Sequence, residues 1–182
     1  STSDFLEAFD LVNSENIYVF PNNSNIILAA KQAKDIYDKS NIYILETKNV
    51  GQAYSSLAML DYSLDNPDDL YNLFNENLLA NKTALVCKAT RDVLLNGIDV
   101  NKNNYISLID KKIIASSDNI LDVIRETIDN VDVSILTMFY GQDLNENDKA
   151  AINEMLNSEY SHLEIYDMQG DQEVFDLILI LE

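Results

Sequence analysis

Residues 17 to 30 decide the fold class, and they read Ile17-Tyr18-Val19-Phe20-Pro21-Asn22-Asn23-Ser24-Asn25-Ile26-Ile27-Leu28-Ala29-Ala30. The first four residues are β-branched or aromatic, which favours a buried strand. The proline ends that strand, and polar residues that favour turns follow it. From residue 26 to residue 37 apolar side chains recur every three or four positions, which predicts an amphipathic helix. This stretch therefore predicts a strand, a loop and a helix in succession.

The same order continues on both sides of this stretch. Before it, apolar residues at helical spacing from 5 to 12 predict a helix that Thr2 or Ser3 would cap. After it, residues 42 to 45 predict a second buried strand, and a helix follows over residues 53 to 60. Alternation of strand and helix predicts a parallel sheet with right-handed crossovers. We therefore expect an α/β fold.

The pattern changes after Asn81, which suggests a boundary between two lobes. Asn96-Gly97 and Asp110-Lys111 interrupt short apolar runs, and such dipeptides favour hairpin turns. We expect an α/β lobe of strand-loop-helix units over residues 1–81. A mixed α/β lobe with hairpins is expected over residues 82–182.

The rest of the second lobe alternates helices and strands. Asp118 is expected to cap a helix that ends near Ile128, and Gly141 is expected to supply a turn with positive φ after an apolar strand. The other expected elements are a strand at 133–140, a helix at 145–156 and strands at 162–166 and 174–181.

Composition and charge exclude several classes of protein. The chain has 182 residues, of which 47% are hydrophobic and 24% charged, an ordinary globular composition. Its formal net charge of -19 argues against nucleic-acid binding, because phosphate contacts need clustered Lys and Arg, and it disfavours an anionic membrane surface. No apolar run approaches the ~18 residues of a bilayer span, and no signal peptide begins the sequence. The start without Met is typical of a domain excised from a longer protein.

The sequence lacks recognisable catalytic motifs. Cys87 is the single cysteine, so no intrachain disulfide or cysteine-cluster zinc site can form, and a reducing, cytoplasmic compartment fits best. His162 is the single histidine and has no nucleophile motif to partner it. A phosphate-binding Walker loop, a dinucleotide-binding glycine fingerprint and a zinc-protease motif are all absent. We expect no catalysis by this chain alone and no cofactor within it.

Two loops are candidate sites because each follows a strand of the predicted parallel sheet. The loop 21–25 opens a helix, where free backbone N–H groups can hold an anion. The interpretation with more weight is that Asn22, Asn23 or Ser24 caps the helix, and a ligand or partner contact is the alternative. The loop 47–52 follows the second strand at the same sheet edge, so its polar groups should converge with the first loop.

Two charged positions complete the set of candidates. Lys48 is either a solvated surface lysine, the interpretation with more weight, or an anchor for an anion. Arg91 lies beside Asp92, and a structural ion pair is favoured over a contact with a partner carboxylate.

The whole sequence resembles the C-terminal domain of bacterial fatty acid kinase catalytic subunits, which are relatives of dihydroxyacetone kinases. Residues 19–30, with their Asn-Asn-Ser-Asn segment, carry the most specific part of the resemblance. Residues 47–52 resemble the family's Thr-x-x-Ile-Pro-Gln-Gly loop, although Gly51 and Ala53 replace its proline and last glycine. The remaining similar segments are Thr90-Arg91-Asp92, Phe139-Tyr140-Gly141-Gln142-Asp143 and Gln169-Gly170-Asp171-Gln172.

This resemblance implies a fold similar to DegV proteins and dihydroxyacetone kinases. It also implies a non-catalytic module that docks a separate fatty-acid-binding protein of DegV type. The bound acyl carboxylate would then be phosphorylated, for phospholipid synthesis, by an ATP- and Mg-dependent domain outside this chain. The resemblance leaves open a homodimer of the full-length kinase protein.

We therefore carry two hypotheses from the sequence. The first is protein docking, in which the acidic surface steers a basic patch of the partner. The second is a small-ligand site for a phosphate or acyl phosphate between the two loops. Hydrolysis by paired carboxylates has only the abundance of Asp and Glu behind it. The expected partner- or ligand-binding residues are Asn22, Asn23, Asn25, Lys48, Gln52, Arg91 and Asp92.

Overall fold

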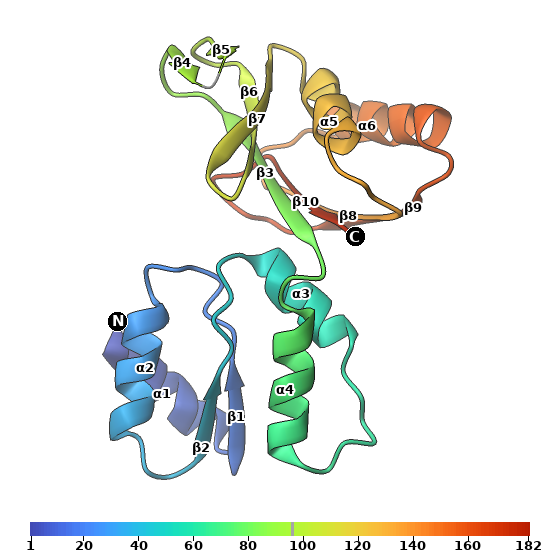
Figure 1. Ribbon diagram of the computed structural model, residues 1–182. Helices are drawn as coiled ribbons and strands as arrows, with labels where there is room; N and C mark the ends of the chain where they lie inside the picture. The colour runs from blue at the N-terminus through green and yellow to red at the C-terminus, as the bar shows by residue number, and fades with distance from the viewer. Residues whose placement is uncertain (96) are drawn as a thin grey trace. The chain divides into compact units, whose positions relative to one another are not determined.

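The computed structural model describes residues 1–95 and 97–182 (Figure 1). The chain folds as two compact units, unit 1 over Ser1–Asn81 and unit 2 over Lys82–Glu182. The change of pattern after Asn81 coincides with this division.

Unit 1 has a two-stranded parallel sheet at its centre, in agreement with the parallel sheet expected from the sequence. Strand β1 (Asn16–Val19) pairs with β2 (Asn41–Ile44), so that Ile17 lies opposite Ile42. Figure 1 shows helices α1 (Thr2–Val12) and α2 (Ile27–Ile36) on one face of this sheet. The opposite face is covered by α4 (Pro67–Asn77), against which α3 (Val50–Ala58) packs.

Side-chain alternation along the strands builds the two cores of unit 1. The side facing α1 and α2 buries an aliphatic and aromatic cluster that includes Phe9, Ile17 and Ile42. On the other side, Phe74 of α4 is 3% exposed and its ring makes edge contacts with Tyr18 and Phe20, at centroid distances of 5.5 and 5.4 Å. Period-two alternation thus buries both faces of each strand.

The cap of the first helix differs from the expected one. Ser1, not Thr2 or Ser3, is the N-cap of α1, because its hydroxyl accepts the N–H of Asp4 and the Asp4 carboxylate accepts from the N-terminal ammonium group. This reciprocal capping box starts the helix earlier than the sequence predicts. Asn66 caps α4 and Pro67 occupies its first turn, as their residue types favour.

Unit 2 is built on a six-stranded sheet in the order β7-β6-β3-β10-β8-β9. All neighbours are antiparallel except β8 and β9, which are parallel. The strands are β3 (Lys82–Lys88), β6 (Tyr105–Ile109), β7 (Lys112–Ser117), β8 (Ile135–Tyr140), β9 (Glu164–Gln169) and β10 (Leu177–Leu181).

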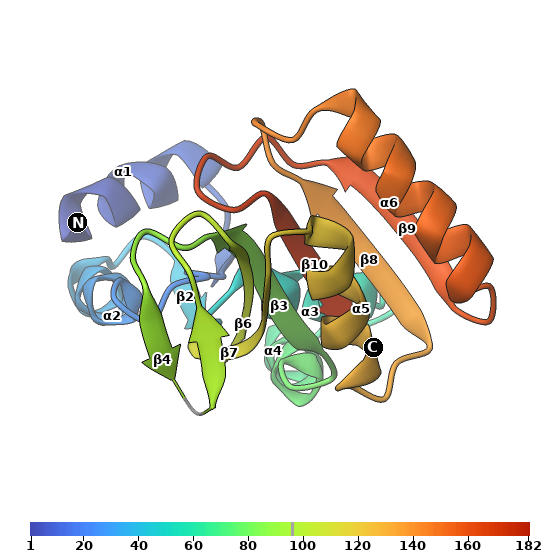
Figure 2. The same ribbon diagram turned by 90° about the horizontal axis from the view of Figure 1, so that it is seen from above.

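Helices α5 (Ile120–Asp129) and α6 (Glu146–Glu159) lie over one face of this sheet, as Figure 2 shows from above. They bury the main core of the unit, and the central strand β10 contributes Leu177, Leu179 and Leu181 to it. Asn119 rather than Asp118 caps α5, since its Oδ1 atom accepts the N–H of Leu121 at 2.9 Å.

Both expected hairpins are present in unit 2. Asp110 and Lys111 have φ angles of 49° and 66° at the turn between β6 and β7, the geometry that two-residue hairpins favour. A separate antiparallel hairpin joins β4 (Val93–Leu95) to β5 (Ile98–Val100). Asn96, which the sequence predicts in its turn, lies outside the described residues.

The role expected for Gly141 is wrong. Its φ is not positive; instead, a Cβ atom at this position would lie 2.3 Å from the carbonyl oxygen of Phe175. The glycine is required by the close approach of two backbone segments, which the hydrogen bond from its N–H to the Asp176 carbonyl at 2.9 Å holds together.

Candidate functional site

The two loops that follow β1 and β2 are joined by a hydrogen bond. The N–H of Asn22 donates to Thr47 Oγ1 at 2.9 Å. Thr47 is fully buried, and its own N–H donates to the Leu45 carbonyl at 2.6 Å. The convergence expected from the sequence is therefore confirmed, because parallel strands bring both loops to the same sheet edge.

The first loop does not cap α2 in the expected way. Ile26 is the N-cap residue of α2 and makes no side-chain capping bond, so the interpretation that Asn22, Asn23 or Ser24 is the cap is wrong. Asn23 Oδ1 instead accepts the N–H of Asn25 at 2.9 Å, which closes a local turn before the helix. The polar side chains shape the loop rather than the helix end.

Asn22 is the most unusual residue of this loop. It is half-buried with a φ of 59°, a left-handed conformation that asparagine tolerates better than most residues. Its Oδ1 atom is buried and has no hydrogen-bond partner in the described part of the chain. Asn23 and Asn25 are exposed. The loop therefore presents two exposed amides beside one that is buried.

The second loop is fixed by reciprocal side-chain bonds. Asn49 caps α3, since its Oδ1 atom accepts the N–H of Gln52 at 3.0 Å. Gln52 Oε1 accepts the N–H of Lys48 at 2.7 Å. Gln52 thus has a structural role, while the Lys48 side chain is exposed at the surface. The family's proline and glycine positions, Gly51 and Ala53, are both buried within α3.

Arg91 and Asp92 belong to unit 2, on the connection between β3 and β4, and both are exposed. Within the residues that the structure describes, they form no ion pair with each other, so that expectation is wrong. Asp92 Oδ1 accepts the N–H of Lys102 at 2.6 Å, and this bond ties the two ends of the hairpin together. The carboxylate is therefore used by the backbone, which leaves the Arg91 guanidinium at the surface.

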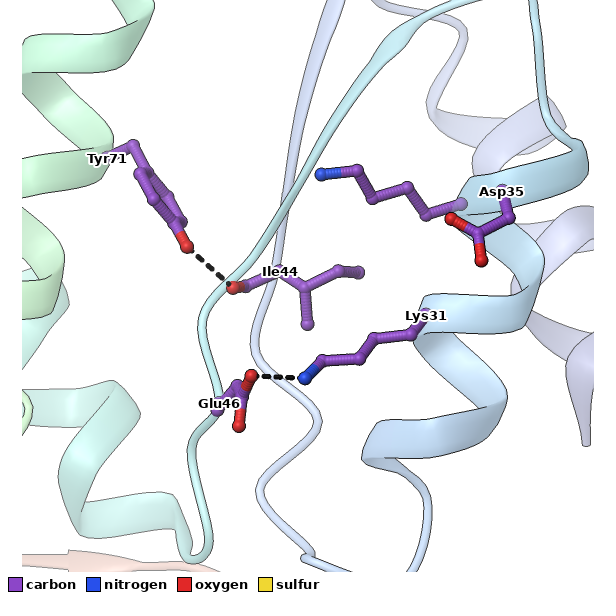
Figure 3. A pocket seen from close by; sticks show the side chains of 6 residues that line it. Lys31, Asp35, Ile44, Glu46 and Tyr71 are labelled. Atoms are coloured by element: carbon purple, nitrogen blue, oxygen red, sulfur yellow. Dashed lines mark hydrogen bonds and ion pairs between the residues drawn. The ribbon is translucent and has the colours of Figure 1, made fainter.

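A cavity of about 280 Å³ lies beside β2, and no local pattern in the sequence indicates it. Figure 3 shows Tyr71 from α4, Glu46 after β2 and Lys31 from α2 around it. The Tyr71 hydroxyl donates to the Ile44 carbonyl at 3.3 Å, and Lys31 pairs with Glu46. Because these groups come from three separate elements, no short motif could have identified them.

A second group of polar residues that sequence reasoning missed lies between α6 and β9. The Tyr140 hydroxyl donates to Asp167 Oδ2 at 2.9 Å, and Lys149 Nζ contacts Gln169 Oε1 at 2.8 Å. Burial and the neighbouring Asp167 raise the pKa of Tyr140, which therefore stays protonated and donates. The Tyr-Tyr-Gly-like segment was the available signal, but only for Tyr140.

The remaining reactive groups do not form a metal centre or a nucleophile site. Burial, with a smaller effect of Asp176, raises the pKa of the Cys87 thiol and so disfavours the reactive thiolate. Across residues 1–95 and 97–182, no three His, Cys, Asp or Glu side chains are grouped so that they could hold a metal ion. None of the helices described is long and apolar enough to span a membrane.

Comparison with known proteins places the chain in a family. The model of the FakA-like family, the C-terminal domain of fatty acid kinase subunits, matches residues 1–182. Protein YloV of Bacillus subtilis is 28% identical over 189 residues, and protein SERP0792 of Staphylococcus epidermidis, which is uncharacterised, is 26% identical over 185. Each match covers 100% of this chain and 33% of the relative, so the chain spans one third of their length.

Solved structures give the fold. The Streptococcus pneumoniae Fatty Acid Kinase (Fak) B3 protein, loaded with linoleic acid, superposes with a TM-score of 0.71 at 16% identity, over 100% of this chain and 76% of that one. DegV of Bacillus subtilis, a fatty acid binding protein, gives 0.64 at 12% identity, over 100% and 77%. The fold is thus that of DegV proteins, and the chain belongs to the FakA-like C-terminal family of fatty acid kinases.

Proposed function

We propose that this chain is a non-catalytic docking module of a fatty acid kinase, and that it binds a separate fatty-acid-binding protein of the DegV family. The observation that carries the proposal is the internal locking of the candidate loops. Thr47, Asn49 and Gln52 spend their polar side-chain atoms on backbone N–H groups, so they hold a shape instead of reacting with a substrate. A fixed, exposed surface suits recognition.

The exposed members of the set are the proposed contact residues. Asn23, Asn25 and Lys48 lie on the joined loops of unit 1, and Arg91 lies on unit 2. The net charge of -19 would attract a basic patch of the partner and speed the encounter. Specific contacts then come from the loops, while the distributed acidic surface supplies the long-range attraction.

The chemistry would take place outside this chain. The DegV-type partner would carry the fatty acid, and an ATP- and Mg²⁺-dependent domain elsewhere in the kinase would phosphorylate the acyl carboxylate. This division of labour accounts for a chain without catalytic motifs. It assigns the module to phospholipid synthesis in the cytoplasm.

Calorimetric titration tests the docking. The chain is titrated at low ionic strength with the DegV-family fatty-acid-binding protein of the same organism, loaded with a long-chain fatty acid. Asn25→Trp places bulk on the exposed loop, and Asn72→Trp on the exposed surface of α4 is the matched control. We expect the first variant to bind at least ~10-fold more weakly and the control to bind normally. Absence of binding by the folded wild-type chain would refute the proposal.

A second candidate function is a small-ligand site between the two loops. The observation in its favour is the buried Oδ1 atom of Asn22, which as oriented needs a hydrogen-bond donor such as a protonated phosphate or a hydroxyl. Thermal unfolding with millimolar inorganic phosphate or acetyl phosphate tests it, because a ligand that binds only the folded state raises the Tm. An unchanged Tm with both compounds would remove this candidate.

A further inference from the structure

The sheet of unit 2 has one open edge. β9 pairs with β8 and with no other described strand, whereas β5 lies against β7, the opposite edge strand. Every residue of β9 except Ile165 is exposed. A row of unpaired backbone groups on such an edge is a template for another strand.

The ladder shows which backbone groups of β9 are free. The N–H of Glu164 donates to the Ser134 carbonyl and that of Gly170 to the Tyr140 carbonyl, both at 2.9 Å. In a parallel ladder alternate residues direct both backbone groups to the same neighbour. Residues 164, 166, 168 and 170 therefore face β8. Ile165, Asp167 and Gln169 direct their N–H and C=O groups outward.

Side chains on the α6 face hold β9 straight for such pairing. Asp167 Oδ2 accepts from the Tyr140 hydroxyl at 2.9 Å and from Asn153 Nδ2 at 3.3 Å. At the end of the strand, Lys149 Nζ reaches Gln169 Oε1. The outward backbone groups are thus preorganised, which lowers the entropic cost of adding a strand.

The charge around β9 selects the occupant. Glu164 and Asp167 lie on the strand, and Asp171 and Glu173 follow it directly. Lys149 reaches β9 from α6 but is paired with Glu146 at 2.7 Å. A second copy of this chain would oppose carboxylates to carboxylates, which is unfavourable across strands. A strand that carries Lys or Arg side chains is complementary.

We propose that an edge strand of a basic partner protein adds to β9, with main-chain hydrogen bonds to Ile165, Asp167 and Gln169. On the opposite face from α6, Tyr166 and Met168 are 47% and 37% exposed and offer apolar contacts for alternate side chains of the added strand. This inference rests on the docking function proposed above, because it assigns to the DegV-type partner the edge at which it binds.

Amide hydrogen exchange by NMR, on the ¹⁵N-labelled chain with the unlabelled partner, tests the inference. In the free chain the amides of residues 165, 167 and 169 exchange quickly, and the complex slows them at least ~10-fold. The amides of 166 and 168 already bond to β8 and change less. A complex that forms without slowing the three amides overturns strand addition and leaves docking intact. Absence of any complex overturns both.

A matched pair of variants isolates one backbone donor. Gln169→Pro removes the outward N–H together with the side chain, whereas Gln169→Ala removes only the side chain. We expect the proline variant to bind the partner at least ~10-fold more weakly than the alanine variant. Equal affinities of the two folded variants contradict the inference. Protection of the three amides that rises with concentration of the chain alone identifies a second copy as the occupant and also contradicts it.

Discussion

The two edge strands β2 and β9 are handled in opposite ways. At β2 the Tyr71 hydroxyl occupies the outward carbonyl of Ile44, and the Lys31–Glu46 ion pair lies beside it (Figure 3). At β9 the outward backbone groups of three residues remain open. Proteins normally block exposed edges, so an edge left open on an otherwise well-packed unit indicates recognition. The difference separates a unit closed on itself from one prepared for a partner.

The largest effect is expected from removing the aromatic ring that anchors α4 beside β2. Phe74→Ala should lower the free energy of unfolding by about 3–5 kcal/mol, because a ring 3% exposed leaves a cavity against Tyr18 and Phe20. Urea denaturation measures the change. Tyr62→Ala, at a ring that is 90% exposed, is the control and should stay within about 0.5 kcal/mol. A loss as small as the control's would show that α4 does not hold this edge.

A smaller effect is expected from separating the two loops of unit 1. Thr47→Val keeps the shape but leaves the N–H of Asn22 without its acceptor, which should cost about 1–3 kcal/mol. Denaturation gives the stability, and amide exchange at Asn22 should accelerate. Thr90→Val, at an exposed position in unit 2, serves as the control. Unchanged exchange at Asn22 would argue against a loop junction.

The closure of β2 itself is tested by Tyr71→Phe. Loss of the hydroxyl frees the Ile44 carbonyl and should cost about 0.5–1.5 kcal/mol. The control is Tyr62→Phe, whose hydroxyl lies on an exposed side chain. Equal stabilities of the two variants in denaturant would mean that Tyr71 does not close the edge, and the contrast with β9 would weaken.

The smallest effect concerns pH and the loop that joins β9 to β10. Burial raises the pKa of Asp176 above that of the unfolded chain, while Lys88 opposes the shift. Its contribution to stability is then fully present below the ordinary carboxyl pKa and is lost as the pH rises through the folded-state value. Asp176→Asn should therefore raise the Tm at neutral pH and have little effect near pH 3, where both states are protonated. A Tm that falls at neutral pH would show that the pairing with Lys88 dominates.

Local patterns predicted the elements and one of the two joined regions. The parallel pair β1–β2 and the meeting of the Asn22 and Thr47 loops follow from strand-helix alternation, which fixes the edge where loops emerge. Caps were less certain, because several neighbouring Asn and Ser residues compete and the bond from Asn22 to Thr47 decides among them. That bond is tertiary and leaves no local signal.

Long-range pairing could not be read from the sequence. β10 inserts between β3 and β8, and this placement makes β9 an edge. Nothing near residues 164–169 reports that arrangement, since it depends on contacts far apart in the chain. The ion pair expected between Arg91 and Asp92 failed for a similar reason: Lys102 offers a backbone N–H that occupies the carboxylate.

The most direct test of the docking module is the salt dependence of its affinity for the loaded DegV-family protein. Calorimetric titrations run from about 20 mM to about 500 mM salt, over which the screening length falls from roughly 20 Å to below 5 Å. An acidic chain that docks a basic surface should bind at the lowest salt, with a Kd that rises steadily as salt is added. No binding by the folded chain at the lowest salt, or a Kd that does not change with salt, would contradict the docking proposal.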